Sequence, residues 1–233
     1  MFWGKKSVTL RFVTNNKSAF MYAKPDKATK FLPTWWKDLA KGQRARENMD
    51  MTHCHGFLDL YKKSIILPMW SYLKIDVGVI GTDFYQWEYG DGRSDLSVHP
   101  EGQRGSFLPE SGYQHIKLIS PWLMECDEDI SVAWLDVKYG DKNNPYALSG
   151  VTKPKQMSGS NINMMLPRGE QLKTYEFDVG DPLVHLIPLT EREVKLEWEL
   201  VSNEEFSDRQ PVILYSKFGR HTKALKQCPF GGK

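Results

Sequence analysis

The chain has 233 residues, of which 40% are hydrophobic and 26% are charged, and its formal net charge at pH 7 is +2. This length fits one β-rich domain with a sizeable core, and the composition excludes a disordered chain and a fibrous repeat. The charge excess is too small for the strong positive field of a dedicated nucleic-acid-binding protein, so we expect no sequence-specific nucleic-acid binding.

The N-terminal part of the chain predicts one strand and two short helices. Apolar residues at alternate positions predict a strand over residues 7–13. Thr34 is a typical N-cap residue and predicts a helix over residues 35–40 that ends near Gly42. The apolar residues of 56–63 share one face at helical spacing and predict a second helix.

The middle of the chain predicts several strands separated by a long loop. The same alternation predicts strands over residues 73–80, 84–89, 115–119, a segment after Pro121, and 130–137. Glycines on both sides of Asp91 predict a hairpin turn. Residues 92–114 are rich in Gly, Ser and Pro and predict a long loop.

The C-terminal part predicts a second irregular segment, at 139–159, and then four strands and a short helix. The strands cover residues 161–166, 173–179, 183–189 and 194–200, with a turn at 180–182, and the helix covers 203–206. In 194–200 apolar and charged residues alternate without exception, so Glu197 and Glu199 should face solvent. The side chains expected to face the core are Val194, Leu196, Trp198 and Leu200.

Many short strands broken by Gly, Pro and Asn turns, without regular alternation of strand and helix, predict a mostly β fold. We expect a β-sandwich or jelly-roll-like barrel with two or three short rim helices. A single domain should span residues 1–233 and carry a basic C-terminal tail at 217–233.

Neither secretion nor membrane insertion is indicated. The first ten residues lack the apolar core of a signal peptide, and the longest apolar stretch, 65–70, is far shorter than the roughly 20 residues of a membrane span. Cys54, Cys126 and Cys228 are scattered without CxxC spacing, which argues against a disulfide framework or a structural zinc site. A reducing cytoplasm suits such cysteines.

His53, His55 and Asp59 form the nearest approach to a metal-binding motif. Their spacing partly resembles the ligand motif of cupin barrels, for which His185 would be a candidate further ligand, but the glycine-led consensus of both cupin motifs is absent. A helix that begins in this segment would direct the two histidines to different faces, whereas a strand would direct both to one face. We therefore interpret the segment as a polar helix entry and expect no metal and no cofactor.

No catalytic motif stands out. The chain has no nucleophile elbow and no phosphate-binding loop, and Cys54 between two histidines is a sequence neighbour rather than a nucleophile paired with its base. The acidic run 127–129 fits a solvated turn better than a pair of catalytic carboxylates. These observations favour a protein that is not an enzyme.

Two features indicate contacts with a partner. Trp35 and Trp36 are adjacent on a short helix and cannot easily both face inward, and surface aromatic residues are typical of interface hot spots. The tail 217–233 contains five basic residues and no acidic one, with a local charge of +5. Its candidate contact residues are Arg220, Lys223 and Lys226.

Several sequence blocks resemble a family of tailed-phage proteins of roughly this length, notably from marine and cyanobacterial myophages. The blocks are LPTWWKDL at 32–39, GFLDLYKKSIILPMWS at 56–71, ISPW at 119–122, GDPL at 180–183, IPLT at 187–190 and CPF at 228–230. In that family the second block tends to begin Cys-Pro-Gly where this chain has Cys54-His55-Gly56, so His55 would replace a proline rather than a shared ligand. The resemblance implies a phage origin.

Together these observations favour a structural or decoration component of a tailed-phage virion that acts by protein–protein assembly. Its expected partners are other phage structural proteins, with homo-oligomers, and its expected location is the virion and, during assembly, the host cytoplasm. The long loops and both chain ends would make the contacts. Two alternatives remain open: a cupin-like metal-dependent oxygenase, and a phage protein that binds a small molecule inside the barrel.

Overall fold

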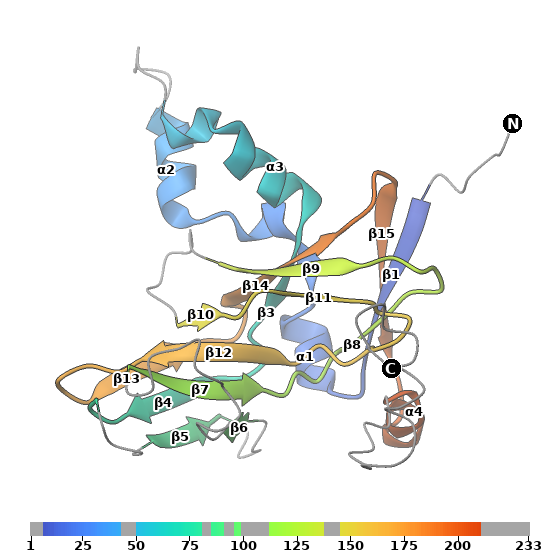
Figure 1. The fold of residues 1–233 in the computed structure, drawn as a ribbon. Coiled ribbons are helices and arrows are strands. Elements are labelled where there is room, and N and C mark those ends of the chain that lie inside the picture. Colours follow the sequence, from blue (N-terminus) through green and yellow to red (C-terminus); the bar gives the residue numbers. More distant parts are fainter. Residues whose placement is uncertain are drawn as a thin grey trace, which may run out of the picture.

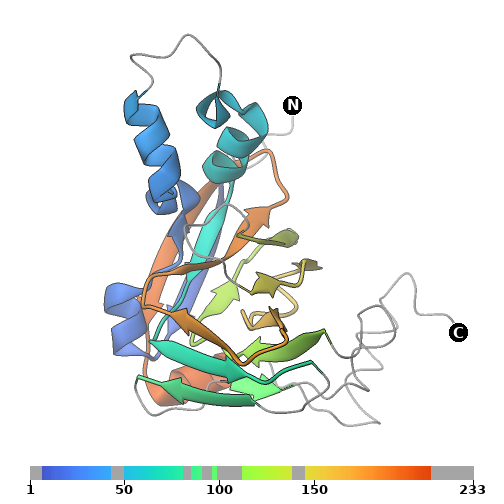
Figure 2. The ribbon, with the colours of Figure 1, turned by 90° about the vertical axis from the view of Figure 1, so that its left-hand side faces the viewer.

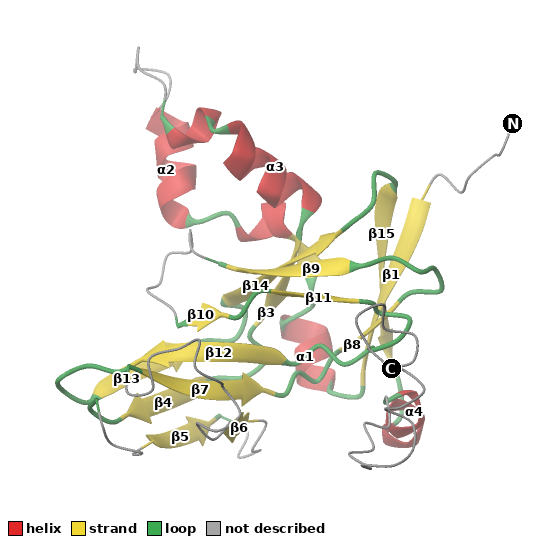
Figure 3. Ribbon diagram, in the orientation of Figure 1, coloured by secondary structure: helices red, strands yellow, loops and turns green. Residues whose placement is uncertain are grey.

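A computed structural model describes residues 7–42, 50–80, 85–90, 96–98, 112–137 and 145–210. These residues form fifteen strands in four sheets, and the helices lie at the margins of the sheets (Figures 1 and 3). The mostly β fold predicted from the alternation is therefore confirmed, and the arrangement is consistent with a β-sandwich.

The four sheets have three, four, five and three strands. The first contains, in spatial order, β15 (Glu193–Leu200), β1 (Ser7–Thr14) and β8 (Leu123–Glu125). The second contains β10 (Tyr146–Ala147), β12 (Ile162–Pro167), β7 (Tyr113–Leu118) and β6 (Leu96–Val98). The third contains β11 (Gly150–Thr152), β9 (Val132–Asp136), β14 (Pro182–Pro188), β3 (Ile65–Pro68) and β2 (Asp26–Lys27), and the fourth β13 (Lys173–Phe177), β4 (Leu73–Val77) and β5 (Tyr85–Tyr89).

Four α-helices occur in the described residues, whereas two or three were expected. They are α1 (Lys17–Tyr22), α2 (Thr34–Gly42), α3 (His55–Lys63) and α4 (Asn203–Arg209). Two 3₁₀ helices, η1 (Ala28–Phe31) and η3 (Met51–His53), accompany α2 and α3. The helix that the sequence did not predict is α1, which Asn16 caps by accepting a hydrogen bond from the Ala19 amide at 3.0 Å. None of the described helices is long and apolar enough to cross a membrane.

β1 and β15 are the first and last strands described, and they pair in parallel along their whole length, from Ser7 opposite Glu193 to Thr14 opposite Leu200. Arg11 and Glu197 lie opposite each other in this pairing and form an ion pair at 3.4 Å. β1 lies between β15 and β8 in the sheet, and its inward side chains Val8, Leu10 and Phe12 are all fully buried. The first and last described strands are therefore joined in one sheet.

A turn and two backbone hydrogen bonds connect the third and fourth sheets. β14 pairs with β3, and β13 pairs with β4, both antiparallel. Between the two pairings, Met69 donates to the carbonyl of Asp181 at 2.7 Å and accepts from the Gly180 amide at 2.8 Å. Gly180 has φ of +92°, so the turn predicted at 180–182 contains the residue type that this conformation requires. It links strands of two different sheets.

The large core lies between the sheets and receives side chains from all four of them. Trp122 is its largest fully buried side chain. Its indole nitrogen donates to the carbonyl of Ala23 at 3.2 Å, and its ring meets Phe12 edge to face with centroids 6.5 Å apart. Trp134 is also buried, as the strand pattern predicts, and its indole nitrogen donates to the Thr152 hydroxyl at 2.7 Å.

The predicted orientation of β15 is right for three of its four apolar residues. Val194, Leu196 and Trp198 are half-buried and pack against the large core, and Glu197 faces solvent. The expectation for Leu200 is wrong, because this side chain is 41% exposed. Leu200 is the last residue of the edge strand β15, and the side chain that packs inward at this end is the next one, Val201, which contacts the cluster of Val13, Leu123 and Phe206.

The irregular segments predicted at 92–114 and 139–159 also need correction. The first contains β6 and the start of β7, and the second contains β10 and β11. These strands have two or three residues each, apart from β7, so alternation could not reveal them. The rest of the two segments, like the hairpin predicted around Asp91, lies outside the described residues.

Candidate functional site

The helices η1, α2, η3 and α3 form a helical lobe at one end of the molecule, above the five-stranded sheet (Figures 1 and 2). This lobe has a small core of its own, whose buried members are Ala28, Phe57, Tyr61, Ile66 and Val137. Phe57 is at its centre. Its ring stacks on Tyr61 at a centroid distance of 4.6 Å. The lobe thus covers one face of the sheet with aromatic side chains.

Trp35 and Trp36 both contact Phe57 although they are adjacent in the sequence. The ring centroids lie 5.5 Å apart for Trp35 and 6.3 Å apart for Trp36. The expectation that two neighbouring tryptophans cannot easily both face inward needs correction in part, because one ring tilts over Phe57 while the other stacks on it and both pack against the small core. Each remains only half-buried, and α2 has no fully buried residue. A contact of these side chains with a partner stays a prediction.

The basic residues predicted to contact a partner, Arg220, Lys223 and Lys226, lie outside the described residues, as does the whole tail 217–233.

The four candidate metal ligands do not come together. His53 and His55 are exposed, and His53 belongs to a capping box in which its Nδ1 accepts from the Asp50 amide at 3.5 Å. Asp59 is exposed on α3, whereas His185 is fully buried in β14. Across the described part of the chain, no group of three His, Cys, Asp or Glu side chains could hold a metal ion. The helix predicted over 56–63, observed as α3, explains the separation of the two exposed histidines.

His185 instead bonds to Ser64 beneath the helical lobe. The Ser64 hydroxyl donates to the carbonyl of Leu60 at 2.6 Å and lies 2.8 Å from His185 Nδ1. Since a hydroxyl has one proton, Nδ1 must be the donor to Ser64, and the unprotonated nitrogen is Nε2. This Nε2 is buried and has no hydrogen-bond partner among the described residues. Burial lowers the pKa of His185 to about 4.

The same geometry argues against nucleophilic catalysis by Ser64. An activated serine gives its proton to the histidine, but here the proton is directed to the carbonyl of Leu60, which lies four residues before it. Ser64 is also 2% exposed. The pair therefore joins the end of α3 to β14 rather than forming a catalytic dyad.

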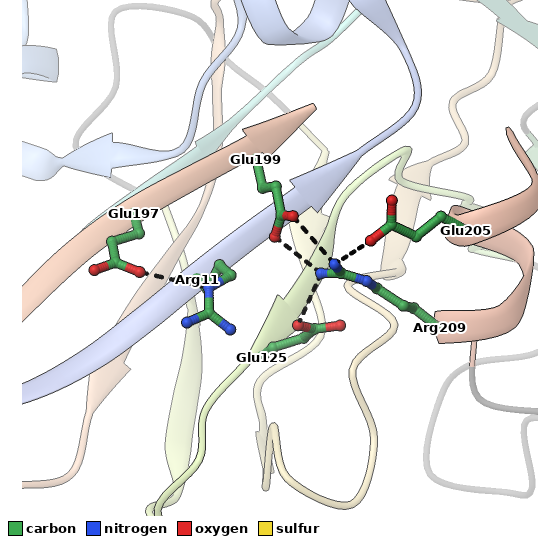
Figure 4. A network of polar contacts seen from close by, with 6 residues as sticks. All are labelled: Arg11, Glu125, Glu197, Glu199, Glu205 and Arg209. Atoms are coloured by element: carbon green, nitrogen blue, oxygen red, sulfur yellow. Dashed lines mark hydrogen bonds and ion pairs between the residues drawn. The ribbon is translucent and has the colours of Figure 1, made fainter. Parts of the chain in front are cut away.

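A network of charged side chains fastens α4 to the first sheet (Figure 4). Arg209 makes two hydrogen bonds to the carboxylate of Glu199, at 2.9 and 3.1 Å, and ion pairs with Glu205 and, at 3.5 Å, with Glu125. The bonds from Arg209 lower the pKa of Glu199. This network joins α4, β15 and β8, so its role is structural.

A pocket of about 300 Å³ opens where the end of α3, β2 and the start of β15 meet. Its polar lining includes Lys27, Lys62, Lys63, Glu191, Arg192 and Glu193, and we call it the lysine pocket. Ile65, Val194 and Leu196 contribute apolar surface. In this pocket several basic groups gather beside apolar side chains.

The sequence did not predict this pocket. The pair Lys62-Lys63 at the end of a helix is a visible signal, because basic residues are favoured there by the helix dipole. No pattern connects the pair with Lys27 or with residues 188–196, which reach the pocket only through the pairing of β2 and β14 with β3.

No family model, curated protein or solved structure matches the chain. The function must therefore be argued from the residues of this chain.

Proposed function

We propose that the protein is a structural component of a tailed-phage particle and that its helical lobe contacts other proteins of the particle. The observation that carries the proposal is the incomplete burial of α2. This nine-residue helix carries two adjacent tryptophans, yet none of its residues is fully buried. Half-exposed tryptophans on a rigid helix are the side chains that most often supply binding energy at protein interfaces.

The resemblance to tailed-phage proteins supports the same surface. Two of its blocks, residues 32–39 and 56–71, cover most of α2, all of α3 except its first residue, and β3. The segments that carry the resemblance are thus the ones that build the lobe and attach it to the sheet. The lobe also stands clear of the other sheets in both views, so a partner could reach it (Figures 1 and 2).

The experiment is mass spectrometry of purified phage particles, followed by incorporation of variants. We expect the protein in particles, and we expect the double variant Lys37→Glu, Lys41→Glu to lower its incorporation at least tenfold. Both lysines are exposed on α2 and do not pack against Phe57, so the fold should be retained. Lys173→Glu, at an exposed position of β13 away from the lobe, is the matched control.

The variant Trp35→Ala provides a second test of the same surface. Incorporation of this variant into particles should fall, while circular dichroism shows that it is folded. Absence of the protein from particles, or normal incorporation of the double lysine variant, would contradict the proposal.

A further inference from the structure

We propose that the lysine pocket binds a small organic anion that carries an apolar body, such as a phosphate ester of an aromatic or aliphatic group. This proposal does not depend on incorporation into a particle, and its test uses the isolated protein. It rests on the charges of the pocket, on its apolar surface and on its size.

Of the described residues that line the pocket, three lysines form no direct ion pair, and they outnumber the two glutamates, Glu191 and Glu193, that also line it. Within the described residues, Lys27, Lys62 and Lys63 form no ion pair, although all three line one pocket. Lysines elsewhere differ: Lys30 pairs with Asp26 at 2.5 Å and Lys153 pairs with Asp129 at 3.1 Å. Gathering like charges costs electrostatic free energy, which a bound anion would offset.

Arg192 lines the wall of the pocket, but its charge is already paired within the protein. Its guanidinium bonds to Glu128 at 2.5 Å, and its amide donates to the Thr190 hydroxyl at 3.2 Å. These bonds hold the connection between β14 and β15 in place. The lysines are consequently the cations left for a ligand.

The apolar side of the pocket indicates the rest of the ligand. Val194 and Leu196 are half-buried and present aliphatic surface next to the lysines, whereas Ile65, which is 3% exposed, only forms the floor behind them. A bare inorganic anion would leave this surface in contact with water. An apolar group attached to the anion would remove it from water, which is favourable in proportion to the area covered.

The size and the acidic residues limit the choice of ligand. A volume of about 300 Å³ is at the lower end for small-molecule sites and suits one ring or a short chain rather than a dinucleotide. Glu191 and Glu193 also line the pocket, and both are exposed. Their negative charges would repel the continuous phosphates of a nucleic acid, whereas a single anionic group can lie beside the lysines away from them.

The test is titration of the isolated protein with phenyl phosphate, followed by calorimetry and by amide chemical shifts. We expect binding in the micromolar to millimolar range that weakens as salt is raised, with shifts centred on residues 62–65 and 188–196. Inorganic phosphate should bind at least tenfold more weakly, because it lacks the apolar group. Benzyl alcohol should also bind at least tenfold more weakly, because it lacks the charge.

The double variant Lys62→Gln, Lys63→Gln should weaken phenyl phosphate binding at least tenfold. Both side chains are exposed, and an unchanged melting curve would show that the fold is intact. Lys37→Gln, an exposed lysine on α2 outside the pocket, should bind like the unaltered protein. Equal binding of inorganic phosphate, unchanged binding by the double variant, or tighter binding of a single-stranded oligonucleotide at these residues would each overturn the proposal.

Discussion

The large core and the small core of the helical lobe are built on different principles. The large core takes aliphatic and aromatic residues from every sheet, and its central Trp122 has its indole nitrogen bonded. The small core has five buried residues, adjoins the buried imidazole of His185, and has two half-exposed tryptophans at its surface. Within the described structure, unpaired buried indole nitrogens occur in both regions, at Trp36 in the lobe and at Trp70 in the large core. The lobe should nevertheless be the less stable region, because its core contains far fewer buried residues.

The largest effect should follow from a cavity in the large core. Trp122→Ala removes a fully buried side chain, so we expect the free energy of unfolding to fall by about 3–5 kcal/mol, measured by urea denaturation. Trp198→Ala is the comparison, because Trp198 is only half-buried and its loss should cost clearly less. Equal losses would show that the two tryptophans are equally important for packing.

Phe57→Ala should separate the lobe from the rest of the protein. Phe57 contacts Trp35, Trp36 and Tyr61, and its truncation should destabilise the lobe by about 3–4 kcal/mol. Hydrogen exchange of α2 and α3 should accelerate while exchange of β1 and β7 changes little. Uniform acceleration through all the sheets would mean that the two cores unfold as one unit.

The third effect is a pH dependence specific to the small core. The pKa of His185 is about 4 in the folded protein and about 6.5 in the unfolded chain, so the unfolded state binds the proton first as the pH falls. His185 should therefore reduce stability progressively between pH 6.5 and pH 4, by roughly 3 kcal/mol in all. Urea denaturation at a series of pH values measures this slope.

His185→Leu should remove that part of the slope, whereas His53→Gln should leave it in place because His53 is exposed. A slope that is the same in all three proteins would contradict the burial of a neutral imidazole. The direct measurement is titration of the His185 ring signals by nuclear magnetic resonance.

Prediction from sequence worked best for strands with one buried and one exposed face. Residues 194–200 and 73–80 show this alternation, and the structure contains β15 and β4 there. β3 was missed because all four of its residues are buried. Ile65 and Leu67 face the large core while Ile66 faces the small one, so a strand between two cores has no polar side to reveal it.

The candidate sites were harder to predict because they depend on tertiary contacts. The half-burial of Trp35 and Trp36 follows from the position of Phe57, which is about twenty residues away in the sequence. The lysine pocket joins Lys27 to residues near 63 and 192. Only sheet register brings these segments together, and local periodicity contains no information about the partners of a strand.

The parallel pairing of β1 with β15 has a consequence for synthesis of the chain. Val8 of β1 pairs with Val194 of β15, which the ribosome adds to the chain almost two hundred residues later. At 5–20 residues per second this delay is roughly 10–40 s, during which the strand Ser7–Thr14 has no β15 to pair with. Val8, Leu10 and Phe12 would remain available for wrong pairings with other chains in that interval. The first sheet can therefore close only after β15 has been made, and a chaperone that shields the strand Ser7–Thr14 until then should raise the yield of folded protein.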